Sequence, residues 1–570
     1  MERQRPDTSS DEIDLYIRTY YSLLRSSGEV RVRSFEEAHI YSNSSLHEGA
    51  KDTRPDISAF GYAAGRVPES MSDVRRVLLG QAEEQFVAAG ANIQDWQRVS
   101  ARGRRRPYRY DGRGTLAAFI ASASDIDDLV PILTAYQIEW NKIHMLLAQS
   151  TVGQELARGE ITVGDKDLDA RLAEALDLPI ELVARLKQAL GKSAAHGLKL
   201  MASMRLDLRL QLLAGSFNHY QKATQRWWSG IEPVYLKTSK GPQKRPVYFV
   251  SSNTHSLANL LGGYALEHKE QLLATAKAHD PDGVWSQLER AVAEGSDEAA
   301  NLLYFVLRAH LRLSPGSMES VQRWDESNGI YTVPDPGHIE VGAQVIELDK
   351  MVPDRVDPRL RIPGLERLRK SNAVIINVDY PLGMAAYQLL SRVGQGVGEV
   401  RGLYLMGKAA TLNARVGDVM ISKVVQDEHS KNTYMVSNCF NSGDVAPYLR
   451  YGTVFDNQKA LTVRSAFLQN REYMGVFYRE GYTVLEMEAG PYLSGIFELV
   501  DPNRHPNDEL VNVGERTNFD VGVLHYASDT PYSRRQSLLS KSMGFFGIDS
   551  TYACAIAITR RILSQEIQRL

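Results

Sequence analysis

Short runs of aliphatic and β-branched residues alternate with helical segments in the second half of the chain. These runs are residues 342–349, 372–378, 400–406, 417–425, 482–487 and 520–527. Runs of this length, separated by segments with apolar residues at helical spacing, are typical of strands in an α/β sheet. We therefore predict that residues 339–570 form one α/β domain.

The first half has apolar residues mostly at helical spacing and few strand-like runs. The expected helices are 11–25, 71–89, 114–150, 166–177, 179–190 and 195–228. This pattern predicts a mainly α-helical N-terminal region over residues 1–240. A strand–turn–helix pattern begins at Arg245, and a Pro- and Gly-rich linker covers 314–338. Residues 241–338 are therefore assigned to a small α/β and helical segment with a linker.

The composition excludes several classes of protein. The chain has 570 residues, a formal net charge of −3 and 43% hydrophobic residues, which is typical of a globular protein and not of a disordered one. Cys439 and Cys554 are too few for a disulfide framework or a four-cysteine zinc site. The sequence has neither an uninterrupted apolar run of membrane-spanning length nor the apolar segment of a signal peptide. We expect a soluble, cytoplasmic protein without membrane or nucleic-acid partners, because acids and bases nearly cancel.

Two polar stretches each allow two interpretations. Residues 102–113 are rich in arginine and tyrosine, and they form either a solvated surface loop or a contact for phosphate or RNA. Residues 251–256 follow a predicted strand and precede a predicted helix. They form either an ordinary capped turn or an anion site at the start of the helix.

Three segments of the predicted C-terminal domain place polar or small residues at strand ends. One strand runs from Leu403 into the small residues Gly407, Ala409 and Ala410. The other two strands end in Glu486-Met-Glu-Ala489 and in Ser528-Asp529. In open α/β sheets, ligands bind outside the carboxyl ends of the strands. All three segments are therefore predicted to contribute to one binding site.

This set of motifs resembles the nucleoside phosphorylase and nucleosidase superfamily. The resemblance covers residues 340–570 and includes the turn 407–419, Glu486-Met-Glu-Ala489 and Ser528-Asp529. Within the superfamily, AMP nucleosidases are the most similar group, through Asp427-Glu-His429, the loop 452–457 and the segment 528–531. The resemblance implies a three-layer α/β/α domain that cleaves an N-glycosidic bond. It also implies a homo-oligomer, and neither a cofactor nor a metal.

The resemblance assigns roles to individual residues. Asp529 would be the general acid that protonates the departing purine, and Ser528 would orient it. Glu488 would accept hydrogen bonds from the ribose hydroxyls and favour the positively charged transition state, with Met487 packed under the sugar. The other predicted substrate contacts are Glu486, Gly407, Lys408, Ala409 and Thr453.

Two departures from the superfamily pattern bear on the reaction. Lys408 stands where serine is usual, without the arginine that commonly precedes the turn, and the early glycine-rich turn is altered at 378–383. These changes favour hydrolysis of a purine nucleotide or nucleoside, with AMP-like substrates preferred. One alternative is a phosphorylase in which Lys408 and Arg415 or Arg464 bind inorganic phosphate. A second alternative is a non-catalytic nucleotide-binding or scaffold protein.

Overall fold

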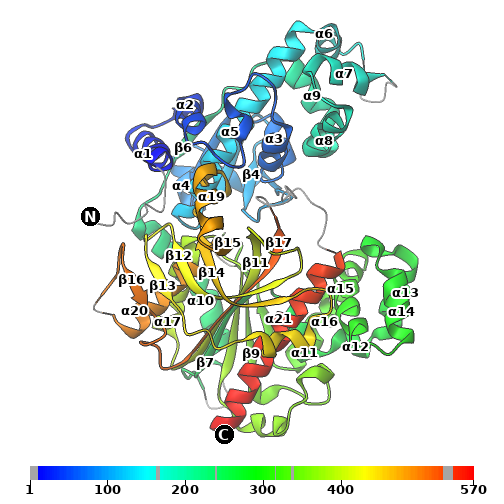
Figure 1. Ribbon diagram of the computed structural model, residues 1–570, viewed down its shortest axis with the longest axis vertical. Coiled ribbons are helices and arrows are strands. Elements are labelled where there is room, and N and C mark those ends of the chain that lie inside the picture. Colours follow the sequence, from blue (N-terminus) through cyan, green and yellow to red (C-terminus); the bar gives the residue numbers. More distant parts are fainter. Residues whose placement is uncertain are drawn as a thin grey trace.

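The computed structural model describes residues 11–161, 167–237, 241–314, 316–335, 339–502, 504–530 and 544–570. Within these residues the chain forms a 6-stranded sheet and an 11-stranded sheet, each with its own helices (Figure 1). The smaller sheet belongs to an N-terminal body, residues 11–214, which is blue and cyan in the figure. The larger sheet belongs to a second body, here called the large-sheet body, which begins with α10 (Phe217–Leu236). No helix among the described residues is long and apolar enough to span a membrane.

The N-terminal body is itself an α/β unit. Its strands, in spatial order, are β1 (Val30–Arg31), β6 (Arg209–Leu212), β2 (Arg76–Gly80), β5 (Thr115–Phe119), β4 (Tyr108–Tyr110) and β3 (Gln97–Val99). Its longer helices are α1 (Asp11–Ser26), α2 (Arg33–Tyr41), α3 (Ile57–Ala64), α4 (Glu83–Ala88), α5 (Ala123–Gln149), α6 (Thr151–Arg158), α7 (Leu168–Leu176), α8 (Ile180–Leu190) and α9 (Ala194–Ser203). The prediction of a mainly helical region missed this sheet. Its strands are five residues or shorter, and β5 is alanine-containing and buried, so the sequence shows no alternating pattern there.

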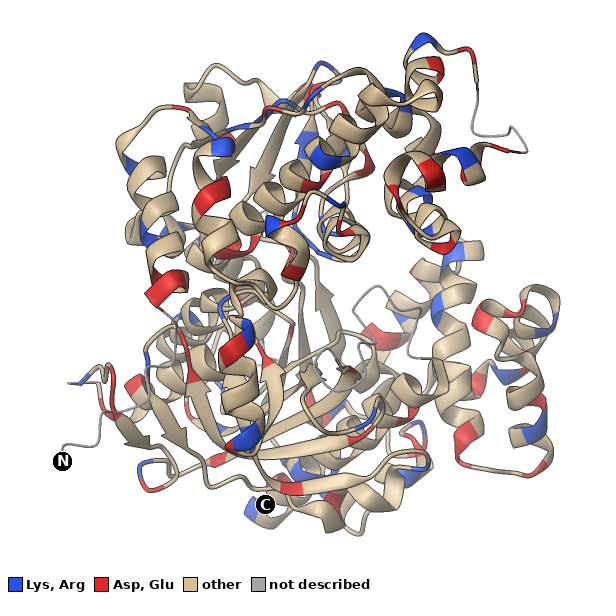
Figure 2. Cartoon of the chain, turned by 45° about the horizontal axis from the view of Figure 1, so that its top comes forward, with Lys and Arg blue, Asp and Glu red and all other residues tan. Residues whose placement is uncertain are grey.

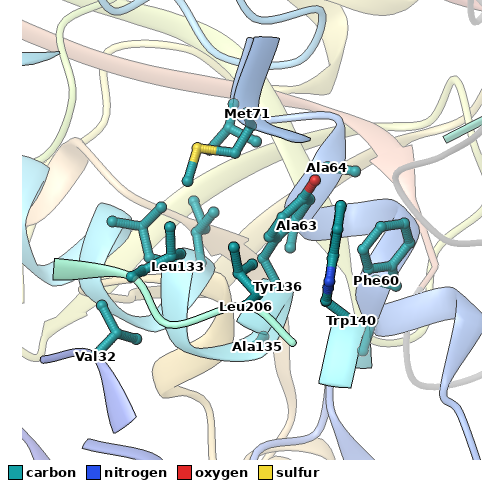
Figure 3. Close-up of a cluster of buried hydrophobic side chains, with 14 of the residues drawn as sticks. Val32, Phe60, Ala63, Ala64, Met71, Leu133, Ala135, Tyr136, Trp140 and Leu206 are labelled. Atoms are coloured by element: carbon teal, nitrogen blue, oxygen red, sulfur yellow. The ribbon is translucent and has the colours of Figure 1, made fainter. Parts of the chain in front are cut away.

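Helix α5 forms the centre of the N-terminal body. Leu133, Tyr136 and Trp140 of α5 are buried, and Tyr136 and Trp140 lie near Phe60 of α3 (Figure 3). The rings of Phe60 and Tyr136 are stacked with their centroids 5.0 Å apart. Trp140 is fully buried, and its Nε1 donates a hydrogen bond to the carbonyl oxygen of Met204 at 3.2 Å. This core fixes the turns that reach the large-sheet body.

The large sheet contains the strands predicted from the second half of the chain. Its order is β16 (Leu510–Asn512), β13 (Thr433–Met435), β12 (Val419–Asp427), β14 (Val454–Thr462), β15 (Tyr482–Glu486), β11 (Val400–Thr411), β7 (Val247–Ser252), β10 (Val374–Asp379), β9 (Ala343–Glu347) and β8 (Ile330–Val333), and β17 (Asp520–Asp529) pairs with β11 and β12. The structure corrects the boundary that was expected near residue 339. β7 lies between β10 and β11, so it belongs to this sheet and not to a separate small segment.

Helices cover both faces of the large sheet. Val247 and Phe249 of β7 share one buried cluster with α10, α17 (Met384–Gly396) and α20 (Ala489–Val500). Tyr248 and Val250 point to the other face and share a cluster with α21 (Gly544–Arg569). The helices α11 (Ser256–Gly262), α12 (Tyr264–Glu267), α13 (Lys269–His279), α14 (Trp285–Ala293), α15 (Glu298–Leu313) and α16 (Gly316–Ser327) follow β7 and lie on the side of α21 (Figure 1). The burial of both faces explains why these strands read as continuous apolar runs.

Candidate active site

Three strand ends of the large sheet meet beside the N-terminal body (Figure 1). β11 pairs along its length with β17, and its last residues also pair with β15. Ala410 of β11 lies opposite both Asp529 of β17 and Leu485 of β15. Because neighbouring strands are about 4.8 Å apart, the backbones at Asp529 and Leu485 are about 10 Å apart. The structure therefore brings the segments that contain Asp529 and Glu488 close together.

Asp529 is the last residue of β17 and is only 4% exposed. The hydroxyl oxygen of Ser528 lies 2.6 Å from Oδ2 of Asp529 and 3.2 Å from the carbonyl oxygen of Ala409. Burial raises the pKa of Asp529 above its usual value, while Ser528, Arg66 and Lys408 oppose the rise. A raised pKa favours the protonated form of a carboxyl group, which is the form that can donate a proton. The geometry at Asp529 is therefore suited to a proton donor.

Glu488 lies between β15 and α20. Its Oε2 accepts a hydrogen bond from the backbone N of Met487 at 3.3 Å. Burial raises the pKa of Glu488 to about 8, and the charge of Glu486 adds to the rise, while Arg104 and Arg105 of the N-terminal body lower it. Two carboxyl groups with raised pKa values, Glu488 and Asp529, thus end neighbouring parts of one sheet.

The raised pKa of Glu488 predicts a pH-dependent stability. The folded protein binds more protons at this site than the unfolded chain between the ordinary value of 4.5 and about 8. The free energy of unfolding therefore falls as the pH rises through this range. We expect Glu488→Gln to be more stable than the wild type at pH 8, by on the order of 2 kcal/mol, and nearly equal to it at pH 4.5. Urea unfolding at both pH values measures this, with the exposed Glu480→Gln as the control, and an equal difference at the two pH values would contradict it.

Both carboxyl oxygens of Glu486 have hydrogen-bond partners within the protein. Its Oε2 accepts hydrogen bonds from the backbone N atoms of Glu488 and Ala489, both at 2.7 Å, and its Oε1 contacts the hydroxyl of Thr462. Glu486 is 3% exposed, and burial raises its pKa to about 7. These bonds fix the turn from β15 into α20. The carboxyl of Glu486 thus supports the position of Glu488, and its predicted contact with substrate stays a prediction.

Three further predicted substrate contacts, Gly407, Lys408 and Ala409, lie on β11 next to Asp529 and Ser528. A side chain on Gly407 would lie 3.7 Å from the ring of Tyr380, and Lys408 is close enough to Asp529 for each to shift the pKa of the other. Ala409 is buried, and its carbonyl oxygen contacts Ser528.

Met487 and Thr453 have contacts within the protein, and their predicted contacts with substrate stay predictions. Met487 packs against a hydrophobic cluster that includes Leu412 and Leu485. Thr453 is exposed, and its backbone N donates to Oδ1 of Asp418 at 2.8 Å. Thr453 therefore supports the turn before β12, and no hydrogen bond recorded among the described residues joins it to Asp529 or Glu488.

The basic stretch 102–113 contacts the large-sheet body. Arg105 forms an ion pair with Asp379 at the end of β10, and its Nη2 donates to the carbonyl oxygen of Tyr380 at 3.1 Å. The side chains of Arg104 and Arg106 are 18% and 1% exposed. The interpretation of this stretch as a solvated surface loop is therefore wrong for Arg104 and Arg106, whereas the side chain of Arg105 is 48% exposed.

A second contact joins the start of α5 to the altered turn 378–383. The hydroxyl of Ser124 accepts a hydrogen bond from the backbone N of Met384 at 2.9 Å and lies 3.1 Å from Nε2 of His429. Gly383 has φ of +52°, and a Cβ there would lie 2.2 Å from the Ser124 oxygen. Asp427 in turn holds Nδ1 of His429 at 2.9 Å. The segment Asp427-Glu-His429 therefore connects the two bodies, which its sequence did not indicate.

The sequence suggested two anion sites, one at Arg415 or Arg464 and one in the loop 251–256, and the groups of both have hydrogen-bond partners within the protein. Arg464 donates from its backbone N and its Nε to Glu428, and the exposed Arg415 contacts Asp418 through its backbone. In the loop 251–256, Oδ1 of Asn253 accepts hydrogen bonds from the backbone N atoms of His255, at 3.1 Å, and of Ser256, at 2.7 Å. This loop has the geometry of the ordinary capped turn. Pro531, which ends the segment 528–531, lies outside the described residues.

Comparisons with known proteins give a family and several weak structural likenesses. The model of a family described as "Family of unknown function (DUF6909)" matches residues 32–564. No curated protein matches the chain.

Solved structures of nucleosidases and nucleoside phosphorylases match about a third of the chain. A uridine phosphorylase from Schistosoma mansoni in complex with thymidine is 9% identical over 34% of this chain and 71% of that one, with a TM-score of 0.26. A methylthioadenosine phosphorylase from an antarctic soil metagenomic library is 8% identical over 34% and 70%, with a TM-score of 0.25. A 5'-methylthioadenosine/S-adenosylhomocysteine nucleosidase from Colwellia psychrerythraea in complex with adenine is 12% identical over 42% and 87%, with a TM-score of 0.25. At these scores the likeness assigns no residue and no activity to this chain.

Proposed function

The chain belongs to the DUF6909 family, and we propose that it hydrolyses the N-glycosidic bond of a purine nucleotide or nucleoside. The observation that carries the proposal is the pair Asp529 and Glu488. Each is a carboxyl with a raised pKa, and the two end neighbouring parts of the large sheet. Such a pair can serve the two ends of a nucleoside, with an acid at the base and a carboxylate at the sugar.

The proposed reaction divides the work between these two residues. Breaking the bond leaves negative charge on the base and positive charge on the ribose. Asp529 donates its proton to the base, and the hydroxyl of Ser528, 2.6 Å from Oδ2, orients the carboxyl. Glu488 accepts hydrogen bonds from the ribose hydroxyls, and in its ionised form, which the charges of Arg104 and Arg105 favour, it stabilises the positively charged transition state. A water molecule then bonds to the sugar carbon and loses a proton, which restores the protonated form of Asp529 as the base and the sugar product leave.

A phosphorylase is the second candidate, and the placement of Lys408 favours it. Lys408 has no side-chain hydrogen bond or ion pair recorded among the described residues, and it lies close to Asp529. A free ammonium group beside the site can bind inorganic phosphate, which would replace water as the nucleophile. The two candidates therefore differ in one measurable requirement.

Base release from a panel of substrates tests both candidates. AMP, adenosine, inosine and ATP are incubated with the full chain, with and without inorganic phosphate, and the products are separated by chromatography. Hydrolysis predicts free base at the same rate without phosphate, and AMP as the preferred substrate. Release that depends on phosphate would identify a phosphorylase. If no base is released from any substrate under either condition, the proposed function is wrong and a non-catalytic binding protein remains.

A further inference from the structure

The N-terminal body directs Arg66 at the candidate site from the turn that follows α3. Its Nη1 donates to the carbonyl oxygen of Tyr62 at 3.2 Å, and its guanidinium lies 3.3 Å from the centre of the Tyr62 ring. Gly103 donates its backbone N to the carbonyl oxygen of Gly65 at 2.7 Å, which holds the arginine-rich loop against this turn. Arg66 is 7% exposed. The guanidinium is therefore buried and fixed before any ligand binds.

Arg66 and the neighbouring Arg104 each have an unused donor. The Nε atoms of both residues are buried and have no hydrogen-bond partner among the described residues. Nη2 of Arg104 forms an ion pair with Oδ1 of Asp128 at 2.6 Å, whereas no ion pair within 4.0 Å is recorded for Arg66 among the described residues. A buried donor without a partner costs free energy unless a ligand supplies the acceptor. Burial accordingly lowers the pKa of Arg66, the direction expected for a cation without a close counterion.

These two arginines act on the two carboxyl groups of the proposed reaction. The charge of Arg66 lowers the pKa of Asp529, and the charge of Arg104 lowers the pKa of Glu488. Arg66 and Arg104 are also close enough to repel each other. Arg105, the neighbour of Arg104 in the chain, contacts Tyr380, whose ring lies 3.7 Å from the Cβ position of Gly407, so this loop lies beside the place where substrate is proposed to bind.

Positive groups of the large-sheet body approach the same place. Lys408 of β11 influences Asp529, and Arg308 of α15 influences Lys408. Among the described residues, no side-chain hydrogen bond and no ion pair is recorded for Lys408 or Arg308. Elsewhere on the chain, acidic and basic residues are interspersed over both bodies (Figure 2), and the net charge is −3. The unpaired positive charge is therefore a local property of this site.

We propose that Arg66 and Arg104 of the N-terminal body, together with Lys408, bind a phosphate group at the candidate active site, so that the site takes phosphorylated nucleosides. The inference rests on the proposed function for the identity of the nucleoside. The planar guanidinium forms paired hydrogen bonds with phosphate oxygens, and two unused Nε donors plus an ammonium match a phosphate with several acceptors. The phosphate is either part of the substrate or free inorganic phosphate. The N-terminal body thereby completes the site of the large-sheet body.

Binding of AMP, adenosine and inorganic phosphate to the full chain tests this inference. Dissociation constants are measured by calorimetry for the wild type, Arg66→Met and Arg66→Lys. We expect Arg66→Met to weaken AMP binding by about 10- to 100-fold, as loss of a charge-assisted hydrogen bond does, and to change adenosine binding by less than about 3-fold. Arg66→Lys, which keeps the charge but loses the planar donor pair, is expected to lie between the two. Arg158→Met, at the exposed end of α6, is the matched control and should leave both affinities unchanged.

Thermal unfolding without ligand separates loss of binding from loss of folding. Methionine has a similar volume and removes a buried charge without a close counterion, so the melting temperature of Arg66→Met should equal or exceed that of the wild type. Added AMP should raise the melting temperature of the wild type and not that of Arg66→Met. A melting temperature for Arg66→Met well below that of the wild type, with AMP still protective, would overturn the inference.

The outcomes also separate the two sources of phosphate and the two proposals. Arg66-dependent preference for AMP over adenosine supports a substrate that carries its phosphate. Arg66-dependent binding of inorganic phosphate that strengthens adenosine binding supports a free phosphate. Equal weakening of AMP and adenosine, or no weakening of either, overturns the inference. Binding and base release are separate measurements, so Arg66-dependent AMP binding with no base release would refute the proposed hydrolysis and retain the phosphate site.

Discussion

Replacing Asp529 by asparagine is expected to reduce the rate of base release from AMP by at least about 100-fold, because the amide has no proton to transfer to the departing base. The substitution keeps the size of the side chain, and the Ser528 hydroxyl can still donate to the remaining oxygen. We therefore expect a fold close to that of the wild type. The rate is measured by chromatography of the free base under substrate saturation, and folding is measured by thermal unfolding of the same preparation.

The opposite end of the same strand offers a matched control for Asp529→Asn. Asp520 begins β17, and its Oδ2 lies 2.5 Å from Nε of Arg561, far from the candidate site along the strand. Asp520→Asn should retain wild-type rates. A rate for Asp529→Asn close to that of the wild type would show that Asp529 is not the general acid and would remove the main support for the mechanism.

The largest expected effect on stability comes from the core of the N-terminal body. Trp140→Ala removes a fully buried indole together with the hydrogen bond to Met204 and the ring contact with Tyr136. We expect the free energy of unfolding to fall by about 3 to 5 kcal/mol, as is usual for such cavities. Urea unfolding followed by circular dichroism measures this loss. Tyr41 is 59% exposed, so Tyr41→Ala, the control, should change the free energy of unfolding by less than about 0.5 kcal/mol.

The same variant examines the link between the two bodies. Trp140 lies on α5, whose first turn carries Ser124 against Gly383 and His429. Loosening α5 should therefore also weaken AMP binding, although Trp140 does not contact the site. A Trp140→Ala protein with a wild-type free energy of unfolding would contradict the packing in Figure 3.

Local pattern was sufficient for several strands of the second half, although it did not indicate β8, β13, β14 or β16. The runs at 372–378 and 520–527 correspond to β10 and β17, each within two residues at its ends. These strands are buried on both faces and are long enough to be distinguished from helices by their β-branched residues. By contrast, β5 and β6 are short, and β6 lies inside the helix expected over 195–228. Their pairing with β2, which lies far away in the sequence, stabilises them.

The sequence by itself determined which strands end in polar residues, and so it indicated Asp529, Ser528 and Glu488 as one set. It did not determine the direction of each side chain, and Glu486 shows why. Glu486 and Glu488 differ by two positions, yet only the folded turn assigns the first to the start of α20. A carboxylate accepts hydrogen bonds from free backbone N–H groups when the turn brings them close. Which of the two glutamates does so therefore depends on the three-dimensional geometry of the turn.

Only the tertiary structure decided what the N-terminal half contributes. Arg105 and Asp379 are separated by 274 positions, and Ser124 and His429 by 305. No local periodicity records such a contact, because it arises from the packing of two bodies and not from the conformation of either segment. The same holds for the buried, unpartnered Nε of Arg66, since desolvation is a property of the surrounding fold. The sequence supplied the acids of the candidate site, and the packing of the two bodies placed the positive charges beside them.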